Sequence, residues 1–237
     1  GESGLAMARW CAYCQANICV ADTRENPDRL PRLRQEIPEA EFVAGPFALL
    51  DFENFDLVAV SPGLRPDVEL KEILAFAKEH DVPVWSEIEM FAQALKGLEK
   101  ERQYRPNVIA VTGTNGKTTV VTSLTGHMCR RAGKTVRLAG NISPAALDVL
   151  LDVIRKDQLP EIWVLELSSF QLFTTYSLEA DTATVLNLTQ DHLDWHGSME
   201  AYGAAKERIF GEKTVRVLNR GDETVMQMRT SQAPVVS

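Results

Sequence analysis

Short apolar runs alternate with amphipathic segments along the first part of the chain. One run is closed by the acid Asp22, and another ends at the turn Pro62-Gly63, as is typical of buried strands. The segments around these runs have the apolar spacing of helices that pack through one face. We therefore expect strands at 18–22, 56–61 and 82–85, and helices at 5–16, 29–36 and 67–79.

The second part of the chain repeats this alternation. A helix is expected soon after the run that ends at Thr112, with Val121 and Met128 on its apolar face. The tail, 221–237, shows no clear element. Strands are expected at 108–112, 135–139, 162–167, 182–188 and 214–219, and helices at 117–132, 144–154 and 199–210.

This rhythm predicts an α/β fold with mostly parallel, doubly wound sheets. The polar segment 96–106 lacks apolar periodicity, so we expect it to link two domains, with the boundary near residue 103. The first domain, 1–103, is expected to be Rossmann-like with its first strand missing, because the chain opens directly on a helical pattern. The second domain, 104–237, is expected to be incomplete.

Composition and charge narrow the class of protein. The chain has 237 residues, of which 45% are hydrophobic, and a formal net charge of -8. Such a chain can form a core but lacks the basic character typical of nucleic-acid-binding proteins. No run approaches the roughly 20 apolar residues of a membrane-spanning helix, and no secretory leader opens the chain. We therefore expect a cytoplasmic, monomeric protein that binds neither nucleic acid nor membrane.

The four cysteines do not resemble a disulfide framework, because they are few and unevenly placed. Cys11 and Cys14 form a C-x-x-C pair, but a structural zinc site needs a second pair of ligands at similar spacing. No such pair follows in the sequence. We therefore interpret Cys11 and Cys14 as small residues on one helix.

A glycine-rich turn between a strand and a helix is the strongest chemical signal in the chain. The segment 108–119 reads V-I-A-V-T-G-T-N-G-K-T-T. At such a turn, glycines let main-chain N–H groups approach an anion, and the helix N-terminus favours negative charge. Lys117 can reach the terminal phosphates, and Thr118 can bind Mg²⁺. The sequence predicts an ATP site made of Gly113, Thr114, Asn115, Gly116, Lys117, Thr118 and Thr119.

This loop is shorter than the common pattern G-x-x-x-x-G-K-[ST]. That pattern requires glycine at position 111, where the chain has Val111. The departure disfavours a generic GTPase or kinase. A switch or binding module that senses ATP without catalysis stays open, although we identify no water-positioning residue or switch segment.

Polar residues after two further strands extend this site. Glu166 ends a strand, which places its carboxylate at the carboxyl edge of the sheet, where it suits a Mg²⁺ ligand. His192 and His196 lie in a polar loop after another strand. Their spacing would suit zinc on a helix, but the segment lacks the glutamate of a zinc-protease motif. We therefore disfavour zinc.

The start of the chain leaves a second nucleotide-binding interpretation open. The segment 1–4 would end a glycine-rich turn, and Asp22 closes the next strand like an acid that binds a ribose hydroxyl. NAD binding is a fair alternative on this pattern. The first strand and at least one glycine of the NAD fingerprint are absent from the sequence, however.

The segment T-G-T-N-G-K-T-T at 112–119 resembles the loop that the ATP-dependent Mur ligases of peptidoglycan synthesis share with folylpolyglutamate synthetase. The resemblance extends over most of the chain. It implies a three-domain enzyme in which ATP phosphorylates a carboxylate and an amine attacks the acyl phosphate. The third domain of that family is absent, so we expect this chain alone to be inactive or nearly so.

The resemblance also implies roles for residues downstream of the loop. Glu166 would bind Mg²⁺, and His192 would bind a second Mg²⁺. Lys206 matches the family lysine that CO₂ carbamylates, which turns a cation into a group able to hold Mg²⁺. His196 is left structural or solvent-facing. The implied catalytic residues are Lys117, Glu166, His192 and Lys206, and the implied metal ligands are Thr118, Glu166, His192 and carbamylated Lys206.

Within the family, E-L-S-S-F-Q-L at 166–172 resembles the branch that adds D-glutamate to UDP-N-acetylmuramoyl-L-alanine. The segment D-H-L-D-x-H-G at 191–197 is shared with the branch that adds the third peptide residue, diaminopimelate or lysine, so that alternative stays open. The implied partners are ATP, D-glutamate and UDP-N-acetylmuramoyl-L-alanine. The residues implied to bind the UDP-linked substrate are Ser3, Asp22, Thr23, Arg24, Ser61, Gly63, Asn141, Ser168 and Gln171.

Overall fold

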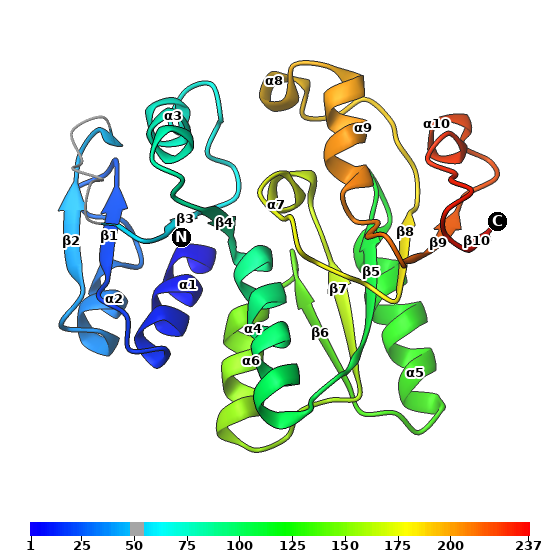
Figure 1. Cartoon of the computed structure of the whole chain (residues 1–237), viewed down its shortest axis with the longest axis horizontal. Coiled ribbons are helices and arrows are strands. Elements are labelled where there is room, and N and C mark those ends of the chain that lie inside the picture. The colour runs from blue at the N-terminus through cyan, green and yellow to red at the C-terminus, as the bar shows by residue number, and fades with distance from the viewer. Residues whose placement is uncertain (48–54) are drawn as a thin grey trace. The chain divides into compact units, whose positions relative to one another are not determined.

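The computed structural model describes residues 1–47 and 55–237, and the chain divides into two compact units, Gly1–Glu87 and Ile88–Ser237 (Figure 1). This division falls earlier in the chain than residue 103. The segment expected as a linker is helical as far as Arg102, because α4 covers Glu87–Arg102. Phe91 and Leu98 of this helix are buried, so α4 is a packed element and not a linker.

The first unit contains short parallel strands, which hydrogen bonds join in two pairs among its described residues. β1 pairs with β2, and β3 pairs with β4. The sequence did not predict β2, because polar and exposed positions at its ends leave only a very short apolar run. The elements are α1 Glu2–Tyr13, β1 Cys19–Asp22, α2 Leu30–Glu36, β2 Glu41–Ala44, β3 Val58–Val60, α3 Lys71–Glu79 and β4 Val84–Ser86.

Two apolar clusters form the core of the first unit. Leu5 of α1 packs in one cluster with Leu30 and Leu33 of α2. Val60 of β3 packs in the other with Ile73 of α3. Each helix thus buries one apolar face, as its residue spacing predicts.

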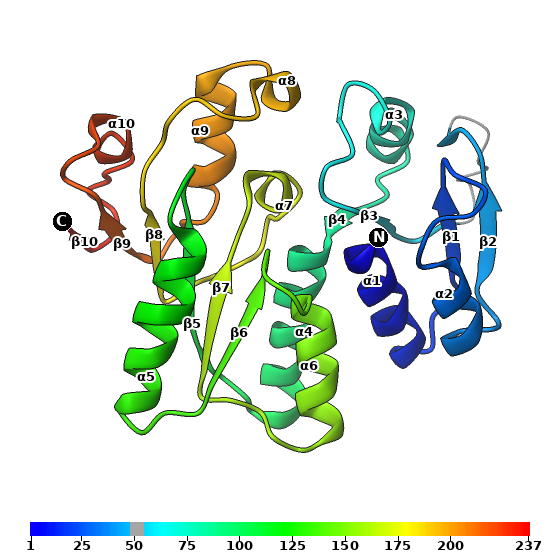
Figure 2. The ribbon, with the colours of Figure 1, turned by 180° about the vertical axis from the view of Figure 1, so that it is seen from behind.

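The second unit is built on a six-stranded parallel sheet of order β10-β9-β8-β5-β7-β6 (Figure 2). Near the end of β5, Val111 aligns with Glu166 of β7 and with Thr184 of β8. The carboxyl ends of these three strands therefore meet at one edge. The strands are β5 Asn107–Thr112, β6 Val136–Gly140, β7 Ile162–Glu166, β8 Thr182–Val185, β9 Val215–Leu218 and β10 Val235–Val236.

Helices cover both faces of this sheet. Figures 1 and 2 show α4 and α6 on one side of the strands and α5 on the other. Among the described residues, no helix has both the length and the apolar character needed to cross a membrane. The helices after α4 are η2 Thr119–Gly126, α5 His127–Arg131, α6 Ala146–Arg155, α7 Ser169–Phe173, α8 Leu193–His196, α9 Met199–Glu207 and α10 Glu223–Met226.

The helix after the glycine-rich turn is not the regular α-helix that the sequence predicts. It forms a π-helix over η2 before α5 begins at His127. A π-helix has i→i+5 bonds and therefore more residues in each turn, so side chains leave the phase of an α-helix. Val121 is fully buried, but Met128 is 65% exposed. The expectation that Met128 packs with Val121 is therefore wrong.

The tail, for which no element was expected, contains α10 and β10. Asp222 caps α10 by accepting hydrogen bonds from the main-chain N–H groups of Thr224 and Val225. β10 pairs with β9 through Val235 and Val236. Both elements are too short to show an apolar period, so pattern alone could not reveal them.

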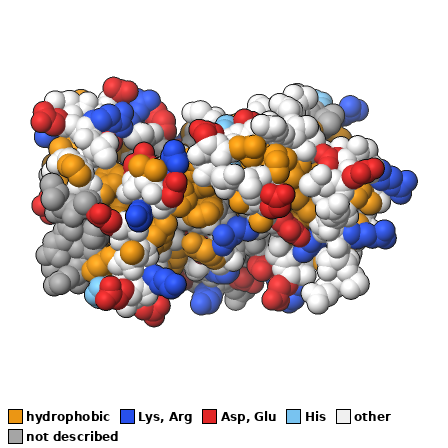
Figure 3. Space-filling model, turned by 90° about the horizontal axis from the view of Figure 1, so that it is seen from above, with side chains coloured by type: hydrophobic (Ala, Val, Ile, Leu, Met, Phe, Trp, Pro, Cys, Tyr) orange, Lys and Arg blue, Asp and Glu red, His pale blue; other side chains and the backbone are white. Residues whose placement is uncertain are grey.

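Charged side chains of both signs are interspersed on the face shown in Figure 3. Exposed ion pairs also occur on the second unit, such as that of Lys134 with Glu161. Pairs of this kind are screened by water and contribute little to stability.

Candidate functional site

The glycine-rich turn lies between the end of β5 and η2, at the carboxyl edge of the sheet. Gly116 has a φ of 81°, a conformation that favours glycine. A Cβ at Gly113 would lie 3.3 Å from the main-chain nitrogen of Leu186, so the turn packs closely against the segment after β8. Both glycines are therefore required by the local backbone geometry.

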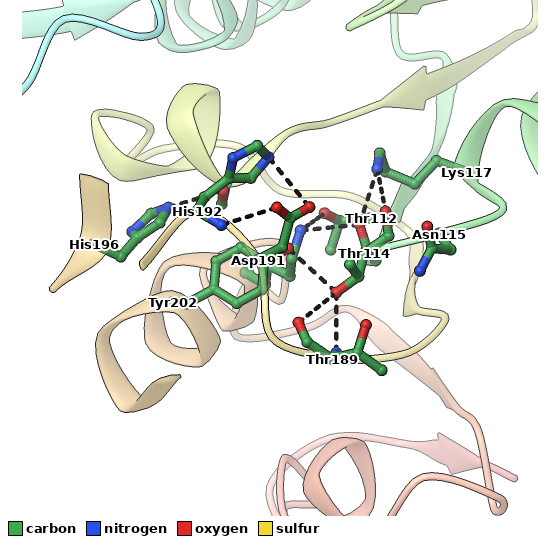
Figure 4. Close-up of polar contacts among 12 residues, drawn as sticks. Thr112, Thr114, Asn115, Lys117, Thr189, Asp191, His192, His196 and Tyr202 are labelled. Carbon is green, nitrogen blue, oxygen red and sulfur yellow. Dashed lines mark hydrogen bonds and ion pairs between the residues drawn. The ribbon is translucent and has the colours of Figure 1, made fainter. Parts of the chain in front are cut away.

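Lys117 lies over this turn (Figure 4). Its Nζ donates hydrogen bonds to the carbonyl oxygens of Gly113 and Thr114, at 3.0 Å each. The positive charge is thereby held beside the start of a helix, where main-chain N–H groups favour an anion. These are the two features that a phosphate group needs.

Glu166 is a buried carboxylate at the same edge, and two exposed residues donate hydrogen bonds to it. Its Oε2 accepts a hydrogen bond from the hydroxyl of Thr118 at 2.7 Å, and its Oε1 accepts one from the side-chain amide of Asn141 at 3.0 Å. Glu166 is 2% exposed. A side chain at Gly140 would clash with the carbonyl oxygen of Glu166, so β6 and β7 approach closely here. The structure thus brings together three of the predicted residues.

This group of oxygen ligands suits Mg²⁺. The ion commonly takes one or two carboxylates and fills its other positions with water and phosphate oxygens. Glu166 and Thr118 offer a carboxylate and a hydroxyl beside the glycine-rich turn. In residues 1–47 and 55–237, no group of three or more His, Cys, Asp or Glu side chains is placed to hold an ion alone. Thr118 and Glu166 are thus two residues of this edge that could hold Mg²⁺.

Lys206 reaches the turn from α9 and is 2% exposed. Its Nζ lies 3.0 Å from the carbonyl oxygen of Gly113 and 4.6 Å from the ring centre of Tyr202. Burial, together with the charge of Lys117, lowers the pKa of Lys206 to about 7, against the opposing effect of Asp191. Without the family resemblance, the sequence would suggest a solvated lysine. Its burial depends on the packing of α9 against the turn.

His192 stands at the beginning of α8 and is exposed. Its backbone has a φ of 51°, which is uncommon for a residue other than glycine. The imidazole Nε2 lies 3.4 Å from the carboxylate of Asp191, and the ring packs 4.7 Å from the ring of Phe170. The structure therefore places the side chain of His192 against Asp191 and Phe170. Two other predicted metal ligands, Thr118 and Glu166, contact each other.

His196 connects α8 to α7. Its Nε2 lies 2.9 Å from the hydroxyl of Ser169, and its ring stacks on Phe170 with an interplanar angle of 4°. Burial and the positive charges of Lys206 and His192 lower the pKa of His196 to about 4. His196 thus joins α7 and α8 through a hydrogen bond and a ring contact.

Ser168 and Gln171 form a capping box at the start of α7. The hydroxyl of Ser168 accepts the main-chain N–H of Gln171 at 3.2 Å, and Oε1 of Gln171 accepts the main-chain N–H of Ser168 at 3.0 Å. Gln171 is buried. These contacts give both residues a structural task that the sequence did not predict.

Three residues contact the turn without having been predicted as site residues. The side chain of Asn187 pairs with the main chain of Asn115, and the hydroxyl of Tyr202 lies 3.2 Å from that of Thr114. The main-chain N–H of Thr189 donates to the same threonine hydroxyl. Asn187 and Thr189 directly follow a strand beside β5, and this position in the sequence is the signal that could have identified them.

The first unit places some of its predicted residues around a small pocket of about 70 Å³. Asp22 and Ser61 line this pocket together with Gly1 and Gly4. A Cβ at Gly4 would lie 3.2 Å from the hydroxyl of Ser61, so the start of α1 and the end of β3 approach closely. These groups come from two strand ends and one helix start, a common arrangement for nucleotide binding.

The other predicted residues of the first unit lie in turns or at its surface. Arg24 donates to both carboxylate oxygens of Asp22, at 2.9 Å each, and its hydrogen bonds lower the pKa of that carboxyl. Thr23 is exposed, Ser3 lies in the first turn of α1, and Gly63 forms a turn with a φ of 95°. Arg24 thus binds a local carboxylate in this structure.

Comparison with protein families gives two matches. Residues 111–237 match the model of the Mur ligase middle domain, and residues 1–86 match the model of the Mur ligase MurD-like N-terminal domain. Together the two models cover most of the chain.

Curated relatives and solved structures agree with these matches. UDP-N-acetylmuramoylalanine--D-glutamate ligase of Ralstonia nicotianae is 62% identical over 95% of this chain and 45% of its own length. The protein of that name from Paraburkholderia phymatum is 58% identical over 98% of this chain and 46% of its own length. The chain therefore spans about half the length of these relatives.

A solved ligase of Acinetobacter baumannii shares the fold. This protein, UDP-N-acetylmuramoylalanyl-D-glutamyl-2,6-diaminopimelate--D-alanyl-D-alanyl ligase, has a TM-score of 0.51 and is 19% identical. The match covers 92% of this chain and 44% of that one. At this identity the likeness concerns the fold alone.

Proposed function

The chain belongs to the Mur ligase family, and from this premise we propose that it carries the nucleotide and UDP-substrate sites of a ligase that adds D-glutamate to UDP-N-acetylmuramoyl-L-alanine. The observation that carries this proposal is the hydrogen bond from Thr118 to the buried carboxylate of Glu166 beside the phosphate-binding turn. The names of relatives at 58–62% identity support D-glutamate over diaminopimelate or lysine as the amine.

The proposed reaction has two steps. The γ-phosphoryl group of ATP passes to the substrate carboxylate, and ADP leaves. The neutral amine nitrogen of D-glutamate then attacks the carbonyl carbon of the acyl phosphate and releases a proton, and inorganic phosphate leaves with the C–O bond electrons. Because both steps move negative charge, the protein contributes mainly by positioning reactants and stabilising charge.

Residues of the second unit would supply that stabilisation. Lys117 is already held at the turn by two carbonyl oxygens, from which its ammonium can move to the phosphates. Thr118 and Glu166 would hold Mg²⁺, which neutralises charge on the phosphate oxygens when bound. Asn141 orients the carboxylate of Glu166 through a hydrogen bond. A second Mg²⁺ at His192 remains part of the proposal.

Carbamylation of Lys206 is also part of the proposal. The reaction needs a neutral amine, whose nitrogen bonds to the carbon of CO₂ and releases one proton. A pKa of about 7 leaves a large neutral fraction near neutral pH. The product would exchange a buried cation for an anion beside Thr112 and Gly113, at the same turn, and could add a ligand for Mg²⁺.

The two units would bind different ends of the UDP-linked substrate, and the second unit would also bind ATP. We propose that the first unit binds the UDP end, through Asp22 and Ser61 in the pocket and through Ser3, Thr23, Arg24 and Gly63 around it. Residues 104–237 would bind ATP, with Asn141, Ser168 and Gln171 facing the muramoyl end. The pocket at Asp22 and Ser61 supports this division.

Nucleotide binding is the first test. Calorimetric titration of the chain with Mg-ATP should give saturable one-to-one binding that ADP competes for and NAD does not. No binding of Mg-ATP, or tighter binding of NAD, would contradict the proposed ATP site.

Ligation is the second test. The chain can be continued by the second half of the Ralstonia nicotianae relative and mixed with ATP, UDP-N-acetylmuramoyl-L-alanine and D-glutamate. We expect phosphate release with D-glutamate and not with diaminopimelate or lysine. If the relative releases phosphate and the hybrid binds Mg-ATP without releasing any, the ligase proposal fails.

A further inference from the structure

Asn187, in the segment after β8, makes a paired contact with the phosphate-binding turn. Its side-chain Oδ1 accepts the main-chain N–H of Asn115 at 2.9 Å, and its Nδ2 donates to the carbonyl oxygen of Asn115 at 3.1 Å. Its own main-chain carbonyl accepts the N–H of Thr114 at 3.0 Å. One residue therefore holds two consecutive residues of the turn.

The side-chain amide of Asn187 can satisfy this contact in only one orientation. A flipped amide would set two donors against each other at the N–H of Asn115 and two acceptors against each other at its carbonyl. Aspartate could accept but could not donate, and alanine could do neither. The contact therefore depends on the chemistry of asparagine and not only on the size of the side chain.

A neighbouring hydroxyl network extends this contact (Figure 4). The hydroxyl of Thr114 accepts the main-chain N–H of Thr189 at 3.1 Å and donates to its carbonyl oxygen at 3.2 Å. Tyr202 approaches the same hydroxyl at 3.2 Å. The turn is therefore attached to the segment after β8 through both Thr114 and Asn115.

These bonds decide which N–H groups of the turn are open to a ligand. The N–H groups of Thr114 and Asn115 already donate to Asn187. Gly116 and Lys117 stand at the start of the helix, where main-chain N–H groups have no carbonyl one turn earlier to bind. An anion at the turn would therefore meet the main-chain N–H groups from Gly116 onward, beginning with those of Gly116 and Lys117.

We propose that Asn187 is a positioning residue for the ATP phosphates. It holds Thr114 and Asn115 away from the phosphates, so that recognition by the main chain starts at Gly116. The proposal rests on the ATP site proposed above. Without the side chain of Asn187, nucleotide binding would have to order the turn itself, and part of the binding free energy would be lost to that ordering.

The first experiment compares Asn187→Ala with Asn107→Ala. Asn107 is an exposed asparagine at the other end of β5, whose main-chain hydrogen bond does not need its side chain. We expect Asn187→Ala to weaken Mg-ADP binding roughly ten-fold, a loss of about 1.4 kcal/mol, which is the scale of one or two hydrogen bonds. Asn107→Ala should bind like the unaltered chain. Equal affinities for both variants would overturn the proposal.

The second experiment needs no variant and therefore decides the matter even if Asn187→Ala does not fold. Amide hydrogen exchange is measured by NMR with and without Mg-ADP. The amides of Thr114 and Asn115 should be protected in both states, while those of Gly116 and Lys117 gain protection with Mg-ADP. New protection at Asn115 on adding Mg-ADP would overturn the proposal. If the unaltered chain does not bind Mg-ADP at all, the proposed ATP site fails instead.

Discussion

The two units of the chain hold their candidate polar residues in different ways. In the second unit, Glu166 and Lys206 are buried and bind groups far away in the sequence. In the first unit, Asp22 and Arg24 are two residues apart, and the Arg24 side chain is 60% exposed. A buried group cannot exchange a lost partner for water, whereas an exposed group can. The same type of substitution should therefore cost much more in the second unit.

Sheet geometry explains this difference. The six-stranded sheet brings the carboxyl ends of β5, β7 and β8 together, so polar groups from distant segments meet in one buried place. The described strands of the first unit form pairs, and Asp22 at the end of β1 binds Arg24, two residues away. The long-range contacts of Glu166 and Lys206 thus follow from the larger sheet.

The largest expected effect concerns Glu89 of α4, which is buried. It accepts hydrogen bonds from the main-chain N–H groups of Tyr176 and Ser177 and from the side chains of Ser177 and Gln93, at 2.6–2.8 Å. Glu89→Ala removes the acceptor for all of these donors. We expect the free energy of unfolding, measured with urea, to fall by about 3–4 kcal/mol.

Glu161→Ala is the matched control for Glu89→Ala. Glu161 also accepts several hydrogen bonds, but it is exposed and pairs with the exposed Lys134. Water can replace these partners, so we expect little change in stability. Equal losses for the two variants would show that burial does not distinguish these carboxylates.

The next effect concerns Lys117 and is measured as nucleotide affinity. Lys117→Met removes the positive charge at the turn but keeps a long side chain. We expect Mg-ATP binding to weaken about 100-fold, or about 2.7 kcal/mol, because charge-assisted bonds to phosphate are lost. Lys134→Met, at an exposed position of the same unit, should bind as the unaltered chain does. A similar loss for both would indicate only a long-range charge effect.

Local patterns were sufficient to predict the parts of the molecule that depend on neighbouring residues. The strands around Val111 and Glu166 are short apolar runs, and Gly113 and Gly116 stand at a strand-to-helix turn where φ and close packing require them. The order of elements, the parallel sheet and the position of Glu166 at its edge follow from these signals.

Other parts depend on contacts that no local pattern records. Lys206 has the sequence context of a surface lysine, yet α9 carries it under the turn. The π-helix changes the phase of the residues before Met128, so the residue spacing of an α-helix does not predict which side chains are buried there. Asn187 contacts the turn through Asn115, which lies 72 residues away in the sequence. Only the folded sheet brings such groups together.

A smaller effect concerns the pH dependence of Glu89. Burial opposes ionisation, but hydrogen bonds from Ser177, Tyr176 and Gln93 outweigh it and hold the pKa of Glu89 below its ordinary value of 4.5. A lowered pKa in the folded state stabilises the fold above pH 4.5, and this contribution is lost as pH falls through the folded pKa. Urea unfolding should therefore show the stability advantage over Glu89→Gln shrinking below pH 4.5. A difference in unfolding free energy that stays constant below pH 4.5 would contradict the lowered pKa of Glu89.

The smallest effect is expected at Arg24 in the first unit. Hydrogen bonds from Arg24 lower the pKa of Asp22 from its ordinary value of 3.8, so Arg24→Gln should raise that pKa towards 3.8. NMR titration of the Asp22 carboxyl carbon measures the change, and Arg65→Gln, which loses a bond to Asp67, should leave Asp22 unaffected. Because Arg24 is exposed, urea unfolding should not change measurably. A loss of stability as large as that of Glu89→Ala would mean that the local pair supports the fold as a buried carboxylate does, and the contrast between the two units would disappear.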